Sequence, residues 1–141
     1  FGISPDGNID NNYNSNYLDT RLFCSEEGFV DYLMPQVYYG FLNSTKPFEE
    51  TVKSWNNLIT ADIDLIPALA FYKTGNVDSY AKEGVNEWVL YNNIIAREVL
   101  LSRELSNYSG FALFRYDSIF GSNLTKASFL EKENLKNILS E

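Results

Sequence analysis

The sequence contains no histidine and only one cysteine, Cys24, among its 141 residues. Without histidine, the chain cannot supply a His-ligated metal site or the base of a Ser-His-Asp triad. A single cysteine excludes an intrachain disulfide and any thiolate cluster within the chain. Cys24 lies in a segment of helical periodicity, so we expect a buried, small apolar side chain there. We therefore expect neither a metal site nor a cofactor.

Basic residues are also scarce, with 11 Lys and Arg against 19 Asp and Glu and a net charge of -8. This balance disfavours nucleic acid as a partner, and it disfavours docking on anionic lipid. The longest apolar run is only a few residues, too short to cross a bilayer as a helix. The first five residues, Phe1–Pro5, have no basic start and do not resemble a signal peptide.

Apolar residues make up 45% of the chain and charged residues 21%, which is typical of a globular protein. The length predicts one domain over residues 1–141. Aromatic residues are the unusual component, with 10 Tyr, 10 Phe and 2 Trp. Such numbers suit a sugar-binding surface, and they equally suit an apolar core.

Strand and helix patterns alternate along the chain. Apolar runs predict strands over residues 1–4, 31–39, 65–72 and 110–116. Amphipathic patterns predict helices over residues 17–27, 46–60, 92–106 and 124–139, and an Asn-rich loop over residues 8–16. The order is βαβαβαβα, which predicts an α/β fold with a parallel sheet. Two architectures fit this order, a small open sheet or half of a (β/α)8 barrel. Because a strand begins at residue 1, we expect the chain to be cut from a longer domain.

Candidate ligand-binding residues follow from the fold class, because parallel sheets carry their sites at the carboxyl ends of the strands. Sugars offer hydroxyl groups to amide and charged side chains and ring faces to aromatic ones. The candidates at the four strand ends are Ser4 and Asp6, Gln36 and Tyr38, Tyr72 and Lys73, and Arg115 and Asp117. In the alternative interpretation, Tyr38 and Tyr72 fill the mouth of a barrel, and Arg115 pairs with Asp117 or Asp6.

Glycoside hydrolysis ordinarily requires two carboxyl groups beside the scissile bond. Asp6 and Asp117 are the acidic residues at the predicted strand ends, so they are the catalytic candidates. Both also lie in turns, where Asp side chains commonly bond to the local backbone. The long segment 74–91 adds Trp88, which would either stack on a sugar or pack against the following helix.

Five segments carry a resemblance to a known family. They are FGISP at 1–5, YLDTR at 17–21, EEGFVDYLMPQVYYGF at 26–41, LIPALAFYKTG at 65–75 and SGFALFRYDSIF at 109–120. In this order and spacing they resemble the glycosyl-hydrolase-like family 10, formerly domain of unknown function 187. The resemblance covers residues 1–120, and residues 121–141 are expected to form a C-terminal helix.

The resemblance implies a (β/α)8 barrel of which this chain is strands five to eight. It implies substrate-binding roles at the strand ends for Ser4, Gln36, Tyr38, Tyr72, Lys73 and Arg115. In the family, an Asp-rich motif precedes the FGISP strand and is absent here, and many members carry an aromatic residue at the position of Asp6. Catalytic carboxylates are therefore expected mostly upstream.

The resemblance also implies hydrolysis of O-glycosidic bonds in an envelope glycan, with peptidoglycan strands as the candidate substrate. The implied location is a bacterial secreted or cell-envelope protein, lipoproteins included. A noncatalytic glycan-binding module on the same scaffold is the second hypothesis.

A structural fragment without activity is the third hypothesis. A half barrel leaves two open sheet edges and one uncovered face, and such surfaces favour association. We therefore expect a homodimer or higher oligomer, an upstream half-barrel as partner in the longer protein, and no hydrolysis by the isolated chain.

Overall fold

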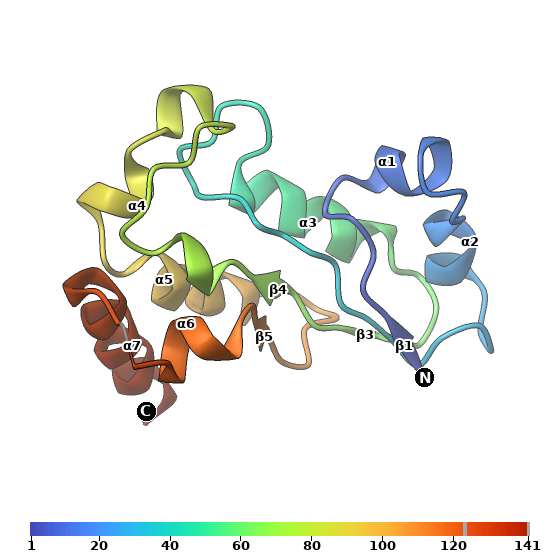
Figure 1. The fold of residues 1–141 in the computed structure, drawn as a ribbon. Helices are drawn as coiled ribbons and strands as arrows, with labels where there is room; N and C mark the ends of the chain where they lie inside the picture. The colour runs from blue at the N-terminus through green and yellow to red at the C-terminus, as the bar shows by residue number, and fades with distance from the viewer. Residues whose placement is uncertain (123, 141) are drawn as a thin grey trace.

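A computed structural model describes residues 1–122 and 124–140. Short parallel strands lie against a layer of helices, as Figure 1 shows. The strands are β1 (Gly2–Ile3), β2 (Tyr32–Leu33), β3 (Asp64–Leu65), β4 (Ala68–Leu69) and β5 (Ala112–Leu113). The α-helices are α1 (Ile9–Asn14), α2 (Thr20–Ser25), α3 (Phe48–Leu58), α4 (Glu87–Leu90), α5 (Ile94–Ser102), α6 (Tyr116–Phe120) and α7 (Lys126–Leu139). Two 3-10 turns, η1 (Phe71–Lys73) and η2 (Lys82–Gly84), follow β4. The predicted α/β class with parallel strands is confirmed.

The strands pair in parallel in one continuous register. β1 pairs with β2, β2 with β3, and β4 with β5. Single bridges from Asp6 to Gln36 and from Gln36 to Ala68 link the two ladders, so β3 and β4 are parts of one extended segment. The resulting order places β1 and β5 at the two edges of the described sheet.

Three prolines explain why the ladders are shorter than the predicted strands. Pro5, Pro35 and Pro67 occupy equivalent positions, each just after a two-residue ladder. A proline nitrogen has no hydrogen to donate, so each interrupts the ladder. Their carbonyl oxygens still accept an N–H from the next strand at 2.9–3.0 Å, which continues the register past the interruption.

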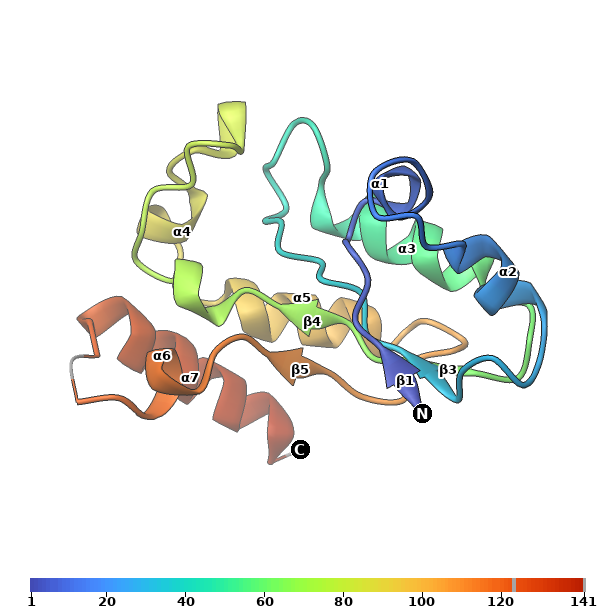
Figure 2. The same cartoon turned by 45° about the vertical axis from the view of Figure 1, so that its right-hand side comes forward.

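The two faces of the sheet differ in burial. Leu33, Leu65 and Leu69 are fully buried, and the helix α5 lies behind β4 in Figures 1 and 2. Because side chains alternate along a strand, Gln36 belongs to the opposite face, where it is only partly buried. Phe114, on the same face, is 47% exposed. The core therefore lies between the sheet and the helices.

The helices contact one another in chain order. α1 packs on α2, α2 on α3, α3 on α5, and α5 on α7. The amphipathic pattern over residues 46–60 predicts an apolar stripe of Val52, Trp55, Leu58 and Ile59. Val52 and Trp55 of α3 are buried, Leu58 is half-buried, and Ile59, just after the helix, is buried. A parallel sheet with a row of neighbouring helices on one face is compatible with half of a (β/α)8 barrel.

The N-terminal segments depart from the predictions in two places. The Asn-rich loop contains α1, which begins after the cap Asn8. The helix predicted over 17–27 begins only at Thr20, because the Asp19 side chain accepts the N–H of Leu22 and caps it. Cys24 is fully buried, as predicted, and burial raises the pKa of its thiol to about 12.

The amphipathic helix predicted over residues 124–139 is confirmed as α7, and residues 121–122 and 124–125 of the expected 121–141 helix lie before it. The helix α7 begins after the cap Thr125, whose hydroxyl accepts the N–H of Ser128. A separate short helix, α6, precedes it, and residues 123 and 141 lie outside the described residues. The buried face of α7 carries Ser128, Glu131 and Leu135. None of the helices in the described ranges is long and apolar enough to cross a membrane.

Two buried glutamates lie at α5, one bonded to its backbone and one without a described hydrogen-bond partner. The Glu131 carboxylate accepts the N–H groups of Ile94 at 3.0 Å and Ala96 at 3.2 Å, and so fixes the start of α5 against α7. Burial outweighs these hydrogen bonds and raises the pKa of Glu131 to about 6. Glu98 is fully buried, and neither of its carboxyl oxygens has a partner among the described residues. Burial, and to a smaller degree the Glu131 charge, raise the pKa of Glu98 well above its ordinary value.

These shifts predict a stability that falls with rising pH. The unfolded carboxyl groups lose their protons near pH 4.5, whereas the folded Glu131 keeps its proton to about pH 6, and the pKa of the folded Glu98 also lies well above its ordinary value. The folded state binds more protons in this window, so the free energy of unfolding decreases as pH rises through it. We expect Glu98→Gln to flatten this dependence and to stabilise the protein at pH 8 by about 1 kcal/mol or more. Urea unfolding of the wild type and of Glu98→Gln between pH 5 and pH 8 measures both effects.

Glu104→Gln is the matched control, because Glu104 is exposed. Wild type and Glu98→Gln curves that run parallel across the pH range would contradict the role assigned to Glu98.

Candidate functional site

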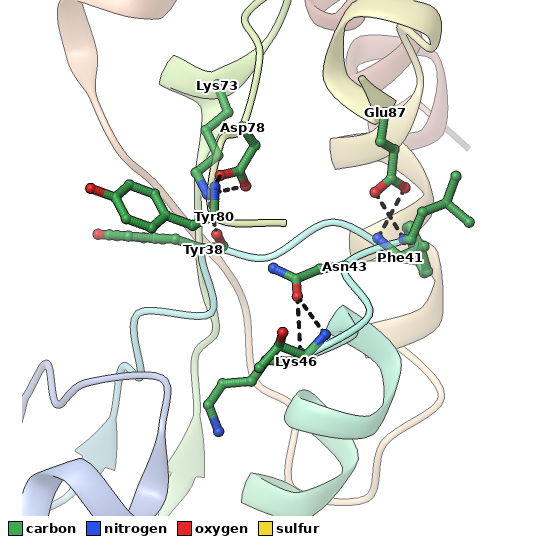
Figure 3. Close-up of polar contacts among 10 residues, drawn as sticks. Tyr38, Phe41, Asn43, Lys46, Lys73, Asp78, Tyr80 and Glu87 are labelled. Carbon is green, nitrogen blue, oxygen red and sulfur yellow. Dashed lines mark hydrogen bonds and ion pairs between the residues drawn. The ribbon is translucent and has the colours of Figure 1, made fainter. Parts of the chain in front are cut away.

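A cavity of about 330 Å³ lies where β1, β2 and β4 lead into their loops. We call it the rim cavity. Its lining residues are Asp6, Gly7, Gln36, Tyr38, Tyr39, Asn43, Thr45, Lys46, Lys73, Asp78 and Tyr80. Four of the predicted site residues, Asp6, Gln36, Tyr38 and Lys73, therefore share one cavity. Figure 3 shows the polar contacts on one side of it.

Lys73 and Asp78 form the best-shielded ion pair at this cavity. Lys73 Nζ lies 2.6 Å from Asp78 Oδ2 and donates a second hydrogen bond to the Tyr38 carbonyl at 2.7 Å (Figure 3). The Asp78 side chain is 3% exposed, and its other oxygen accepts the N–H of Tyr80 at 3.2 Å. The pair thereby ties the loop after β4 to the end of the segment that follows β2.

Asp6 forms the turn between β1 and α1. Its carboxylate accepts the N–H of Asn8 at 2.7 Å and an Nδ2–H of Asn11 at 3.3 Å. The fully buried Asn12 side chain bonds both the N–H and the carbonyl of Asp6 at 2.8 Å. Burial, with the Asp6 charge as a second cause, raises the pKa of Tyr39 to about 12, so its hydroxyl stays protonated near neutral pH.

Ser4 and Gln36 lie side by side at the strand ends. Gln36 Nε2 donates to the Ser4 carbonyl at 3.2 Å. Ser4 itself is exposed and does not line the rim cavity. Of this pair, Gln36 is the one placed to meet a ligand in the cavity.

Three aromatic rings gather beside the cavity. Tyr38, Tyr72 and Phe114 contact one another with ring centroids 5.7–6.0 Å apart. Burial raises the pKa of both tyrosines. The contact is what the mouth-filling alternative predicts for Tyr38 and Tyr72, although Tyr38 also lines the rim cavity.

The structure does not place Asp117 in the rim cavity. Arg115 Nε lies 2.9 Å from Asp117 Oδ1, and both side chains are more than half exposed. Asp117 and Tyr72 line a separate cavity of about 360 Å³. Asp117 lies away from the other strand ends because β5 already ends at Leu113 and Asp117 belongs to the helix α6, which begins at Tyr116. Asp6 and Asp117 therefore do not form a carboxyl pair in one cavity.

Trp88 lies in the core. It is 1% exposed, so neither face of its ring is open to a sugar. Its indole N–H has no partner among the described residues. Of the two roles considered for Trp88, the structure supports packing and contradicts stacking on a ligand.

The loop after β2 was missed as a source of site residues. Glu87, 2% exposed, accepts the N–H groups of Phe41 at 3.0 Å and Leu42 at 2.8 Å (Figure 3). A Cβ on Gly40 would lie 2.1 Å from Glu87 Oε2, so this approach requires glycine. No local pattern reveals the contact, because its partners are 45 or more residues apart.

Asn43 sets the shape of the same loop. Its Oδ1 accepts the N–H groups of Thr45 at 3.0 Å and Lys46 at 2.9 Å. Asparagine commonly closes such turns through its own backbone neighbours. Lys46 is thereby brought to the edge of the rim cavity. In residues 1–122 and 124–140 there is no group of three or more side chains that could hold a metal ion.

The Glu87 contact predicts a loss of stability on substitution. Glu87→Gln replaces one accepting oxygen with an N–H₂ group that faces a backbone donor. We expect the free energy of unfolding to fall by about 1–3 kcal/mol, the cost of an unsatisfied buried polar group. Chemical denaturation measures the loss, and Glu83→Gln at an exposed position is the control. Equal stabilities of the two variants would contradict the anchoring role.

The rim cavity and its loops can be compared with known proteins. The sequence profile described as Glycosyl hydrolase-like 10 matches residues 1–86 of the 141 residues. The chain belongs to the glycosyl hydrolase-like 10 family. The match includes every residue that lines the rim cavity. It ends before β5, so the expected extension of the resemblance to residue 120 stays a prediction.

Curated relatives carry the name Glycosyl hydrolase DigH. The protein of Escherichia coli O6:H1 (strain CFT073) is 28% identical over 134 residues, and the match covers 83% of this chain. Those of E. coli K12 and Shigella flexneri are 27% identical over the same length. The chain spans 29% of the length of these relatives.

Proposed function

We propose that this chain is the substrate-binding half of a bacterial cell-envelope glycoside hydrolase. In the full domain, O-glycosidic bonds of a glycan, with peptidoglycan strands as the candidate, are hydrolysed. The observation that carries the proposal is the rim cavity, where two amides, three tyrosines and two carboxylates from the strand ends and the loops that follow them meet. Family membership and the name of the relatives support a glycan as ligand.

We further propose that the chain supplies strands five to eight of a (β/α)8 barrel. An upstream half would pair with the edges at β1 and β5 and cover the face that carries Gln36 and Phe114. The parallel register and the chain-order row of helices support this arrangement. The match covers 29% of the relatives' length, so proteins as long as these relatives could include such an upstream half. Export to the envelope, with or without a lipid anchor, belongs to the same proposal.

The arrangement of carboxyl groups supports a binding role for the chain alone. Both oxygens of Asp78 are engaged, one by Lys73 and one by the Tyr80 N–H. Asp6 is bonded to its own turn, and Asp117 lines another cavity. A hydrolase needs one carboxyl to donate a proton and a second to act as base or nucleophile. We propose that the catalytic carboxyl groups come mostly from the upstream half.

Calorimetry with peptidoglycan glycan fragments tests the binding role. It is done on the chain extended upstream by half a barrel, which we call the extended chain. We expect binding, and we expect Gln36→Ala to weaken it about fivefold through loss of one or two hydrogen bonds. Asn137→Ala on the exposed side of α7 removes an amide outside the cavity and is the control. Absence of binding by the extended chain would remove the glycan from the proposal.

Release of reducing ends tests the division of catalytic groups. We expect the extended chain to hydrolyse the glycan and the 141-residue chain to release none. Hydrolysis by the 141-residue chain that is abolished by Asp6→Asn would show that the chain holds its own catalytic carboxyl group. Binding without hydrolysis by the extended chain would favour the alternative, a noncatalytic carbohydrate-binding module.

Self-association of the isolated chain is the remaining proposal. The edges at β1 and β5 and the partly exposed Tyr72 and Phe114 would bring two copies together as a homodimer or larger assembly. Light scattering at micromolar concentration is expected to give at least twice the monomer mass of 16.1 kDa. A monomer at that concentration would contradict it.

A further inference from the structure

A second, larger cavity adjoins the rim cavity. It measures about 560 Å³ and lies between α1 and α3. Three residues, Gly7, Thr45 and Lys46, line both cavities. The two cavities thus adjoin at these three residues. Each falls within the range of about 300–1,000 Å³ that is usual for ligand sites.

Lys46 differs in its contacts from the other basic side chains along these cavities. Lys73 is paired with Asp78, and Arg21 lies 3.0 Å from Asp10. Lys46 Nζ has no ion-pair or hydrogen-bond partner among the described residues. The chain has a net charge of -8, and Lys46 is the cation lining these cavities that is not already paired with a described carboxylate.

The backbone of Lys46 is fixed by a hydrogen bond, while its side chain has no described partner. The Asn43 Oδ1 fixes the Lys46 N–H, and Pro47 follows as the cap of α3. Figure 3 shows the Lys46 side chain extending away from Asn43 with its ammonium group at the free end. A fixed backbone with an unpaired ammonium group at the junction of two cavities is suited to bind one anionic group in a defined place.

We propose that the two cavities form one groove for a glycan of more than one sugar, and that Lys46 binds a carboxylate carried by that glycan. The inference rests on the proposed function and adds to it one residue that selects among glycans. Among the described residues, Asp6 in the rim cavity and the exposed Glu50 in the larger one are the lining carboxylates that form no ion pair. They disfavour anionic groups elsewhere in the groove and so restrict the ligand carboxylate to the junction.

Calorimetry on the extended chain tests the inference with two ligands of equal length. One is a peptide-free peptidoglycan strand, which carries carboxylates, and the other is a neutral N-acetylglucosamine oligomer. We expect Lys46→Ala to weaken binding of the carboxylate-bearing strand about tenfold, the effect of one hydrogen bond to a charged group, and to leave the neutral oligomer unchanged. Raising the salt concentration is expected to reduce the difference between the ligands.

Two further variants separate charge from structure. Lys46→Met keeps the length of the side chain without the charge, and we expect it to behave as Lys46→Ala does. Lys53→Ala on the exposed face of α3 removes the same charge outside both cavities and is the control. Unchanged binding of the carboxylate-bearing strand by both Lys46 variants would overturn the inference while the proposed function stands. Failure of the wild-type extended chain to bind either ligand would overturn both.

Discussion

The register between neighbouring parallel strands is the constraint on which the rest of the structure depends. It is continued past each ladder by the carbonyls of Pro5, Pro35 and Pro67, which accept N–H groups although the proline nitrogens cannot donate. This register aligns Asp6, Gln36 and Ala68 in one row across the sheet. The loops that leave just beyond that row therefore begin at the same level, and the rim cavity forms among them.

Polar contacts between distant parts of the chain give those loops their shape. Lys73 and Asp78 join the loop after β4 to the Tyr38 carbonyl, and Glu87 holds the loop after β2 through two N–H groups. These contacts are largely shielded from water, where a lost partner costs more than it does at the surface. Substituting the groups that position the site is therefore expected to lower the free energy of unfolding as well. Glu98 differs from these groups. Its buried carboxyl has no described partner, and it does not line the rim cavity.

The sequence patterns predicted the parallel α/β class, the helix α3 with its buried stripe, and the strand ends that supply Asp6, Gln36, Tyr38 and Lys73. These features arise from local periodicity and from a general rule about parallel sheets. The patterns failed where distant contacts decide the outcome. Trp88 has the residue type of a sugar-stacking ring, but the fold buries it.

The remaining site residues show the same limit. Asp78 and Tyr80 lie in the long segment 74–91, whose length alone indicated a functional loop, while Asn43 and Lys46 lie in a short loop that gave no such indication. Asp117 follows a predicted strand, yet the chain turns into α6 before it reaches the rim. Loop paths depend on contacts such as that of Glu87 with Phe41, which sequence spacing does not encode.

We propose that the rim cavity of this chain binds the glycan. The most direct measurement is an NMR titration of the extended chain, with ¹⁵N labels only in the segment of residues 1–141, against peptidoglycan glycan fragments. We expect the largest amide shifts on the residues around the rim cavity, such as Gln36, Lys46 and Tyr80. Saturable binding with the largest shifts around the Asp117 cavity, or with no shifts in the labelled segment, would contradict it.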